Sequence, residues 1–186
     1  MSMNTTGMMV GSLLLDRPRG IENRDLCASC GGVCCKRGSG LCTPADFGEP
    51  LYDRLLCRLA SGLYVVDYWE GLFAFGGWRT WKPYFVRPRR RFDRAGQPVD
   101  TGLLIDPSWG GQCIFYQEQS GCRLEFEKRP SQCRTLVPHK DPTLCVQPVG
   151  HGKRDCIAAW VPFQCVLKTL IQEHWNGKWV ITKGES

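Results

Sequence analysis

The sequence places four cysteines within a stretch of nine residues, in the pattern Cys27-x2-Cys30-x3-Cys34-Cys35. A CxxC pair lets two thiolates converge on one metal from a single turn, and both zinc ribbons and iron–sulfur proteins use it. Four further cysteines follow far along the chain: Cys113, Cys122, Cys133 and Cys145. If the late cysteines return to the early group, the two sets together complete a metal centre around which the chain must fold.

Cysteine makes up 12 of the 186 residues, and such an even count has two explanations. Secreted proteins use the cysteines as a disulfide framework, whereas proteins of the reducing cytoplasm use them as metal ligands. The apolar stretch Met8–Leu15 has no basic residue before it and no convincing small-residue cleavage site after it. No stretch approaches the roughly 18 apolar residues that span a bilayer. We therefore expect a cytoplasmic protein with no membrane segment, whose cysteines bind metal.

The length suits one domain with a buried core, and 42% hydrophobic with 23% charged residues is the balance of a globular protein. We expect residues 1–20 to form a mobile N-terminal tail. Residues 21–186 are then expected to form a single metal-binding domain that ends in a helix.

Local signals predict an α+β fold, a small irregular metal-centred domain with a short antiparallel sheet and flanking helices. The glycine-rich cysteine block Leu26–Cys42 is expected to be a loop. One helix is predicted between Thr43 and Ser61, broken at Pro50, because leucines recur there at helical spacing. A second helix has an apolar face from Trp160 to Trp175 and is expected to end at Asn176-Gly177.

The middle of the chain, residues 63–109, is rich in aromatic residues and glycine, which favours strands over helices. Tyr84–Phe92 is predicted to pair with Val99–Ile105 across a polar turn. In the same way Cys113–Tyr116 is predicted to pair with Cys122–Phe126. Each pair is expected to form an antiparallel hairpin.

Three further segments follow the first four cysteines: Gly111-Gln112-Cys113-Ile114-Phe115, Gly121-Cys122-Arg123-Leu124 and Arg129-Pro130-x2-Cys133-Arg134-x3-Pro138. Together with the CxxCxxxCC block they resemble the YkgJ-type cysteine-cluster family, whose members are described as zinc- or iron-chelating domains. The resemblance covers residues 26–150 and implies seven metal ligands, Cys27, Cys30, Cys34, Cys35, Cys113, Cys122 and Cys133. Cys145 corresponds to the last cysteine of the family. The resemblance implies metal binding and no defined reaction.

The ligand type does not decide between an iron–sulfur cluster, for example [4Fe–4S], and Zn²⁺, because both accept four thiolates. In extended backbone, Cys34 and Cys35 would point to opposite sides and serve two metal positions. The nearby cations suit an anionic cluster but would stabilise zinc thiolates equally well: Lys36, Arg37, Arg123, Arg129 and Arg134. We favour an iron–sulfur centre slightly.

Four cysteines fall outside the family pattern. Cys57 and Cys165 lie in the two predicted helices, where we expect them to be small core residues. For Cys42 and Cys156 both roles stay open, and either could replace Cys145 as a ligand.

The formal net charge of +6 and the run Arg87-Pro88-Arg89-Arg90-Arg91 raise the question of an acidic partner. The arginines could contact phosphates, but we favour the solvated face of a hairpin. Three functional hypotheses follow. The protein is a redox or accessory and maturation factor with a partner protein, an iron-dependent enzyme whose substrate is held by the aromatic middle, or a zinc-stabilised adaptor for nucleic acid or protein.

Overall fold

The computed structural model describes residues 30–70, 72–75, 78–99, 105–106, 110–138, 145–146 and 152–174. These residues form helices and short antiparallel strand pairs, so the predicted α+β class is confirmed. The expected tail at residues 1–20, the ligand candidate Cys27 and the predicted helix end at Asn176-Gly177 lie outside the described residues.

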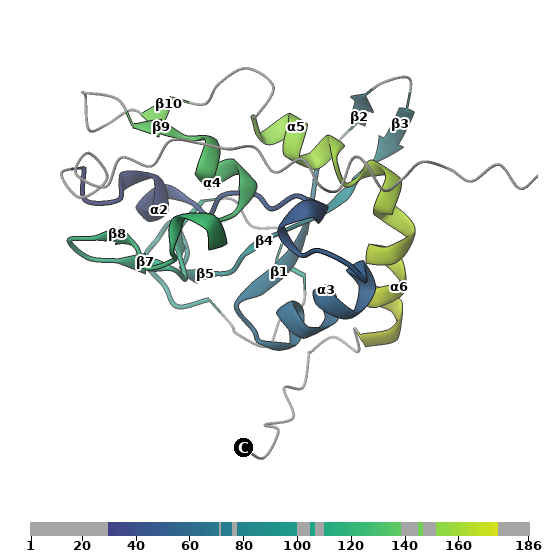
Figure 1. Cartoon of the computed structure of the whole chain (residues 1–186), viewed down its shortest axis with the longest axis horizontal. Coiled ribbons are helices and arrows are strands. Elements are labelled where there is room, and N and C mark those ends of the chain that lie inside the picture. The colour runs from purple at the N-terminus through teal and green to yellow at the C-terminus, as the bar shows by residue number, and fades with distance from the viewer. Residues whose placement is uncertain are drawn as a thin grey trace, which may run out of the picture.

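One side of the molecule is built from a strand pair and two helices (Figure 1). β1 (Tyr64–Tyr68) runs antiparallel to β4 (Tyr84–Pro88). α3 (Leu51–Ala60) packs against β1, and α6 (Gln164–His174) packs against β4 and α3. The fully buried apolar side chains of this core include Leu55, Val66, Phe85, Leu167 and Leu170. Burial of each stabilises the fold by about 1.5–3 kcal/mol.

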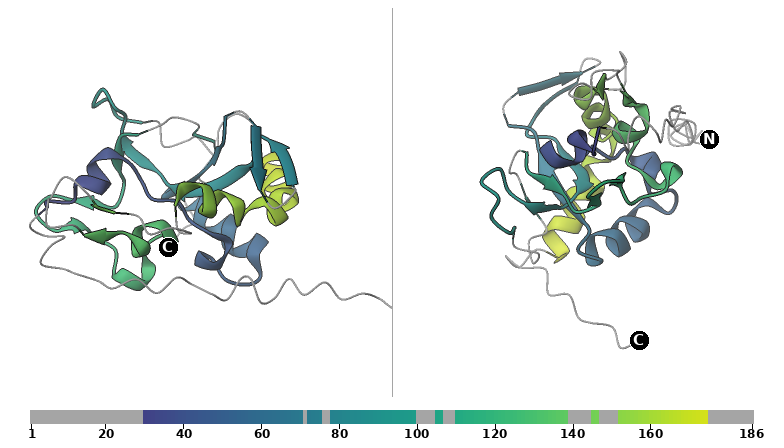
Figure 2. Two further views of the ribbon diagram at one scale, coloured as in Figure 1. Left: turned by 90° about the horizontal axis from the view of Figure 1, so that it is seen from above. Right: turned by 90° about the vertical axis from the view of Figure 1, so that its left-hand side faces the viewer.

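The other side carries the cysteine-rich segments (Figures 1 and 2). There α2 (Val33–Arg37) contacts β6 (Gln112–Cys113) and β8 (Gly121–Cys122). The other elements are η1 (Pro44–Asp46), β2 (Leu72–Phe75), β3 (Trp78–Trp81), β5 (Arg90–Phe92), β7 (Tyr116–Gln117), η2 (Phe126–Lys128), α4 (Ser131–Thr135), β9 (Val137–Pro138), β10 (Cys145–Val146), α5 (Lys153–Ala158) and η3 (Val161–Phe163). The contacts of α2 with β6 and β8 thus bring segments that are far apart in sequence side by side.

The predicted helix between Thr43 and Ser61 is present in two pieces, η1 and α3, with the expected break at Pro50. The backbone N–H of Thr43 donates to the carboxylate of Asp46 at 2.8 Å, which caps the first piece. The prediction of a helix over residues 160–175 is confirmed as far as His174, through η3 and α6.

The two predicted hairpins differ in outcome. Segment 84–92 splits into β4, which pairs with β1, and β5, which pairs with β6. The N–H of Val99 donates to the carbonyl of Arg91 at 3.1 Å and Phe92 forms an antiparallel bridge with Pro98, as the predicted turn requires. Residues 100–104 of the predicted partner strand lie outside the described residues, and Ile105 forms a parallel bridge with Val66 instead. The second hairpin forms in a shorter version, β7 with β8.

The arginine run was predicted to be the solvated face of a hairpin, and this prediction is wrong for three of its members. Arg87, Arg89 and Arg90 are only 2–4% exposed. Arg87 Nε donates to Asp67 at 2.8 Å, and both Arg87 and Arg90 lie 3.2 Å from the buried carboxylate of Asp106. Arg87 and Arg90 are thus paired with buried carboxylates, and Arg89 Nε donates to the carbonyl of Gly62 at 2.7 Å. Burial leaves all three unable to reach the phosphates of a nucleic acid.

Candidate metal centre

The cysteine block contains a helix where a loop was expected. Gly31 and Gly32 adopt positive φ angles of 59° and 69°, and α2 begins directly after them. In a helix, adjacent side chains are separated by about 100°, not by the 180° of extended backbone. The Cys34 and Cys35 sulfurs accordingly lie 4.0 Å apart, so the argument that adjacent cysteines point to opposite sides is wrong here.

A contact between two glycines brings α2 against the late segment of the chain. A β-carbon added at Gly32 would lie 2.6 Å from the Cα of Gly121, closer than real β-carbons approach other atoms. The missing side chains therefore allow the two backbones to meet. As a result Cys35 comes within hydrogen-bonding reach of Cys122, the residue after Gly121.

Four thiols meet at this point: those of Cys34, Cys35, Cys113 and Cys122. Cys35 is the central one, because its sulfur lies 4.0 Å from that of Cys34 and its thiol is within hydrogen-bonding reach of Cys113 and Cys122. Cys113 is held by the pairing of β6 with β5, and Cys122 by the pairing of β8 with β7. All four are free thiols.

Hydrogen-bonding contacts with Cys35 change the ionisation of its neighbours. They lower the pKa of Cys34 to about 7 and that of Cys122 to about 6, and they lower the pKa of Cys113 as well. The pKa of Cys35 itself is raised, because its thiol keeps the shared proton. The group therefore has thiolate character near neutral pH, and the thiolate is the form of cysteine that binds metals.

Backbone N–H groups also point at these sulfurs. The sulfur of Cys113 accepts a hydrogen bond from the backbone of Phe115, and that of Cys122 accepts one from Leu124, two residues later in each case. Arg129 adds a side-chain hydrogen bond and a positive charge to Cys122. Hydrogen bonds of this kind stabilise a thiolate and tune a metal bound to it.

Cys133 lies near the group, behind Gly40. Its sulfur accepts a hydrogen bond from the backbone of Gly40. Burial raises the pKa of Cys133 well above its usual value, and the negative charges of Cys113, Cys34 and Cys122 raise it further. Cys133 is therefore close enough to sense the other thiols, but it is a neutral thiol beside them.

For the remaining predicted ligands, the structure gives a position in the fold. Cys30 is half-buried in the turn that leads into α2, and Cys145 lies in β10, opposite Pro138 of β9. Within the described ranges, no group of three or more His, Cys, Asp or Glu side chains is already arranged to hold a metal ion. The structure thus gathers four predicted ligands as interacting thiols, not as a finished coordination sphere.

The cysteines outside the family pattern also differ from expectation. Cys57 and Cys165 are exposed, so the prediction that they are core residues is wrong. Cys42 and Cys156 are 1% and 5% exposed and belong to the hydrophobic core. Burial raises the pKa of Cys156 to about 12, which makes it a neutral core thiol at physiological pH.

Sequence reasoning named Arg129 and Arg134 only as nearby cations. The structure shows that Arg134 holds the segment that carries Cys133. Its guanidinium donates to Asp46 at 2.9 Å and to the carbonyls of Glu127 and Arg129 at 3.1 and 3.0 Å. No local pattern connects positions 88 residues apart, so this contact had no signal in the sequence.

Comparison with models of protein families, with curated proteins and with solved structures finds no match. No helix in the described part of the chain has the length and apolar character needed to cross a membrane.

Proposed function

We propose that this protein binds a metal centre through the thiol cluster of Cys34, Cys35, Cys113 and Cys122, and that it acts as a redox or accessory factor. One observation carries the proposal. The Cys35 thiol lies 4.0 Å from the Cys34 sulfur and within hydrogen-bonding reach of Cys113 and Cys122, which come from the other end of the sequence pattern. Packing alone does not explain why four thiols should share protons at one point, because structural cysteines are usually dispersed as small apolar residues.

The donor set fits a thiolate-bound metal. Two sulfurs at tetrahedral positions around one zinc ion, each about 2.3 Å from it, lie about 3.8 Å apart. The 4.0 Å separation of the Cys34 and Cys35 sulfurs is close to this value. Bound metal would also replace the shared proton on Cys35, which relieves the crowding of negative charge that raises its pKa.

Four thiolates suit Zn²⁺ or an iron–sulfur cluster such as [4Fe–4S]. Cys27, Cys30, Cys133 and Cys145 are proposed as the further ligands that the YkgJ-type resemblance implies. Cysteines that bind metal suit the reducing cytoplasm, where we propose that the protein acts. A redox or accessory role also implies a protein partner that receives electrons or metal.

The test is anaerobic purification of the full chain, followed by elemental analysis for iron, zinc and acid-labile sulfide. We expect a stoichiometric metal content in the wild-type protein. Equal amounts of iron and sulfide would identify an iron–sulfur cluster, and zinc without sulfide would identify a zinc site. A protein that contains neither metal, and takes up neither on reconstitution, would contradict the proposal.

Matched cysteine variants locate the metal. Cys122→Ser is expected to lose most of the bound metal, because it removes a thiolate that contacts Cys35 and Arg129. Cys165→Ser is the control, since Cys165 is an exposed thiol on α6. Equal metal content in the two variants would show that the metal is bound elsewhere.

A further inference from the structure

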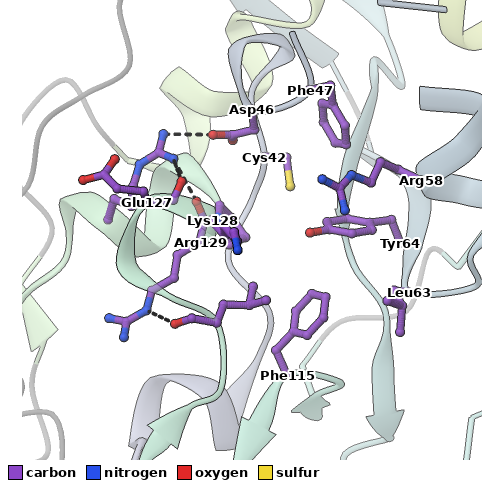
Figure 3. Close-up of a pocket in the computed structure, with 13 residues that line it drawn as sticks. Cys42, Asp46, Phe47, Arg58, Leu63, Tyr64, Phe115, Glu127, Lys128 and Arg129 are labelled. Carbon is purple, nitrogen blue, oxygen red and sulfur yellow. Dashed lines mark hydrogen bonds and ion pairs between the residues drawn. The ribbon is translucent and has the colours of Figure 1, made fainter. Parts of the chain in front are cut away.

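A pocket of about 200 Å³ opens between α3 and β1 on one side and the segment from Leu124 to Pro130 on the other. Figure 3 shows its walls, with Cys42 and Asp46 at one end and Phe115 at the other. Arg129 lines this pocket and also contacts the Cys122 sulfur. The pocket is therefore a neighbour of the thiol cluster but is formed by different side chains.

Aromatic rings form the inner wall of the pocket. The ring of Tyr64 lies 5.7 Å from that of Phe115 and 5.9 Å from that of Phe47, centre to centre. Tyr64 and Phe115 are 7% and 4% exposed, so both rings are fixed by packing. A cavity of about 150 Å³ with apolar walls holds a benzene molecule, so this pocket has room for one six-membered ring and a small substituent.

Positive charge faces the same space. In Figure 3 the guanidinium of Arg58 and the ammonium of Lys128 enter the pocket from opposite sides, with the Tyr64 hydroxyl between them. Within the described residues, the guanidinium of Arg58 forms no hydrogen bond or ion pair. Lys128 pairs only with the exposed Glu125, at 2.8 Å, and such surface pairs exchange readily.

A buried donor in the lining is also unused. The Nε of Arg134 is the only buried side-chain nitrogen or oxygen without a hydrogen-bond partner in the described part of the chain. Arg134 lines the pocket, and its side chain is 2% exposed. The other nitrogens of this guanidinium already donate to Asp46 and to two backbone carbonyls, so Arg134 contributes a fixed positive charge to this wall of the pocket. Two acidic residues also line the pocket. Arg134 and Ser131 already neutralise and hydrogen-bond the carboxylate of Asp46, and in Figure 3 the carboxylate of Glu127 points away from Arg58 and Tyr64.

We propose that this pocket binds a small aromatic anion, a single ring that carries one carboxylate or phosphate group. The ring packs against the wall that Tyr64 and Phe115 form, and the anionic group lies between Arg58 and Lys128. This proposal does not depend on a metal in the thiol cluster, so the two proposals can fail separately.

The test uses benzoate and phenyl phosphate as probes, titrated into the full-length protein by calorimetry. For ligands of this size we expect dissociation constants on the order of 1 mM. Benzamide has the same shape as benzoate but no charge, and it is expected to bind at least tenfold more weakly. Inorganic phosphate lacks the ring and is expected to bind at least tenfold more weakly than phenyl phosphate.

A double variant, Arg58→Gln with Lys128→Gln, is expected to weaken benzoate binding by at least tenfold. The control carries Arg54→Gln with Lys168→Gln, two exposed positions outside the pocket lining that give the same net charge. Thermal unfolding confirms that both proteins are folded. Three results would each overturn the proposal. One is no benzoate binding at a benzoate concentration 20-fold above the expected dissociation constant. The others are equal affinities for benzoate and benzamide, or an equal loss of benzoate affinity in the two double variants.

Discussion

The sulfur of Cys133 occupies the space that a β-carbon would fill at residue 40. Gly40 donates its backbone N–H to the same sulfur, so the two residues are joined by a hydrogen bond at a contact that admits no side chain. The contact fixes the strap between α2 and η1 against α4, and it positions Cys133 beside the other thiols.

Gly40→Ala is therefore expected to displace Cys133 and to lower the free energy of unfolding by about 1–3 kcal/mol, the usual cost of overpacking. Gly38→Ala is the matched control, because a β-carbon at Gly38 has no atom within 4 Å. Urea denaturation measures stability, and elemental analysis measures metal content. A Gly40→Ala protein as stable as the Gly38→Ala protein would show that the contact between Gly40 and Cys133 does not contribute to stability.

Removal of the carboxylate of Asp106 is expected to be more damaging. Asp106→Ala leaves the buried charges of Arg87 and Arg90 with one acidic partner fewer, and breaking a buried ion pair in this way costs about 3–5 kcal/mol. Glu125→Ala removes the exposed partner of Lys128 and is expected to cost less than about 1 kcal/mol. Urea denaturation of both variants measures the loss in the free energy of unfolding. Similar losses in the two would show that the buried ion pairs of Asp106 contribute no more than a surface pair.

Lys153 makes the stability depend on pH in a defined direction. Its burial lowers its pKa from 10.5 to about 8. Below pH 8 the lysine is charged in both states, and the folded state bears the full cost of burying that charge. Between pH 8 and 10.5 the unfolded chain binds more protons than the folded one, so this cost disappears as the pH rises.

Lys153→Met, which keeps the length of the side chain but removes its charge, is thus expected to be more stable than the wild-type protein at pH 7. The difference should shrink toward pH 10. Lys168→Met, at an exposed position of α6, is expected to show no such trend. Denaturant titrations of the three proteins at pH 7, 8.5 and 10 provide the measurement, and a constant difference for Lys153→Met would contradict the lowered pKa.

Cysteine alkylation separates the structural thiols from the exposed ones. Cys57 and Cys165 are exposed and are expected to react with iodoacetamide in the native protein. Cys42 and Cys156 are buried and neutral, so they should react only after unfolding. Peptide mass spectrometry after short labelling gives the order of reaction. Early labelling of Cys42 would show that the segment between α2 and η1 opens in the native state.

The features that the sequence predicted correctly depend on local signals. The capping pattern at Thr43, the break at Pro50 and the apolar spacing in residues 160–174 identify their helices without knowledge of the rest of the chain. The approach of Cys113 and Cys122 to Cys35 was anticipated because a thiol-rich pattern is uncommon unless the thiols act together.

The errors arise where tertiary contacts override a local pattern. The arginine run has the composition of a solvated surface, but Asp67 and Asp106, from other segments of the chain, form buried ion pairs with it. Cys57 occupies a predicted helix, and only the packing of α3 decides that it faces outward. The helix at Val33 begins after two glycines with positive φ. Glycine permits this conformation, but its presence in a sequence does not predict it.

The cluster unites Cys34 and Cys35 with partners that follow about 80 residues later in the chain. During synthesis, the first two sulfurs leave the ribosome long before Cys113 and Cys122 are translated. The four-thiol arrangement therefore cannot exist on a nascent chain shorter than 122 residues. Any metal that binds to the early cysteines must be held by an incomplete set of ligands until the strands that carry Cys113 and Cys122 have been synthesised. For the proposed metal centre, the supply of metal and the completion of the polypeptide are thus linked in time by the order of residues alone.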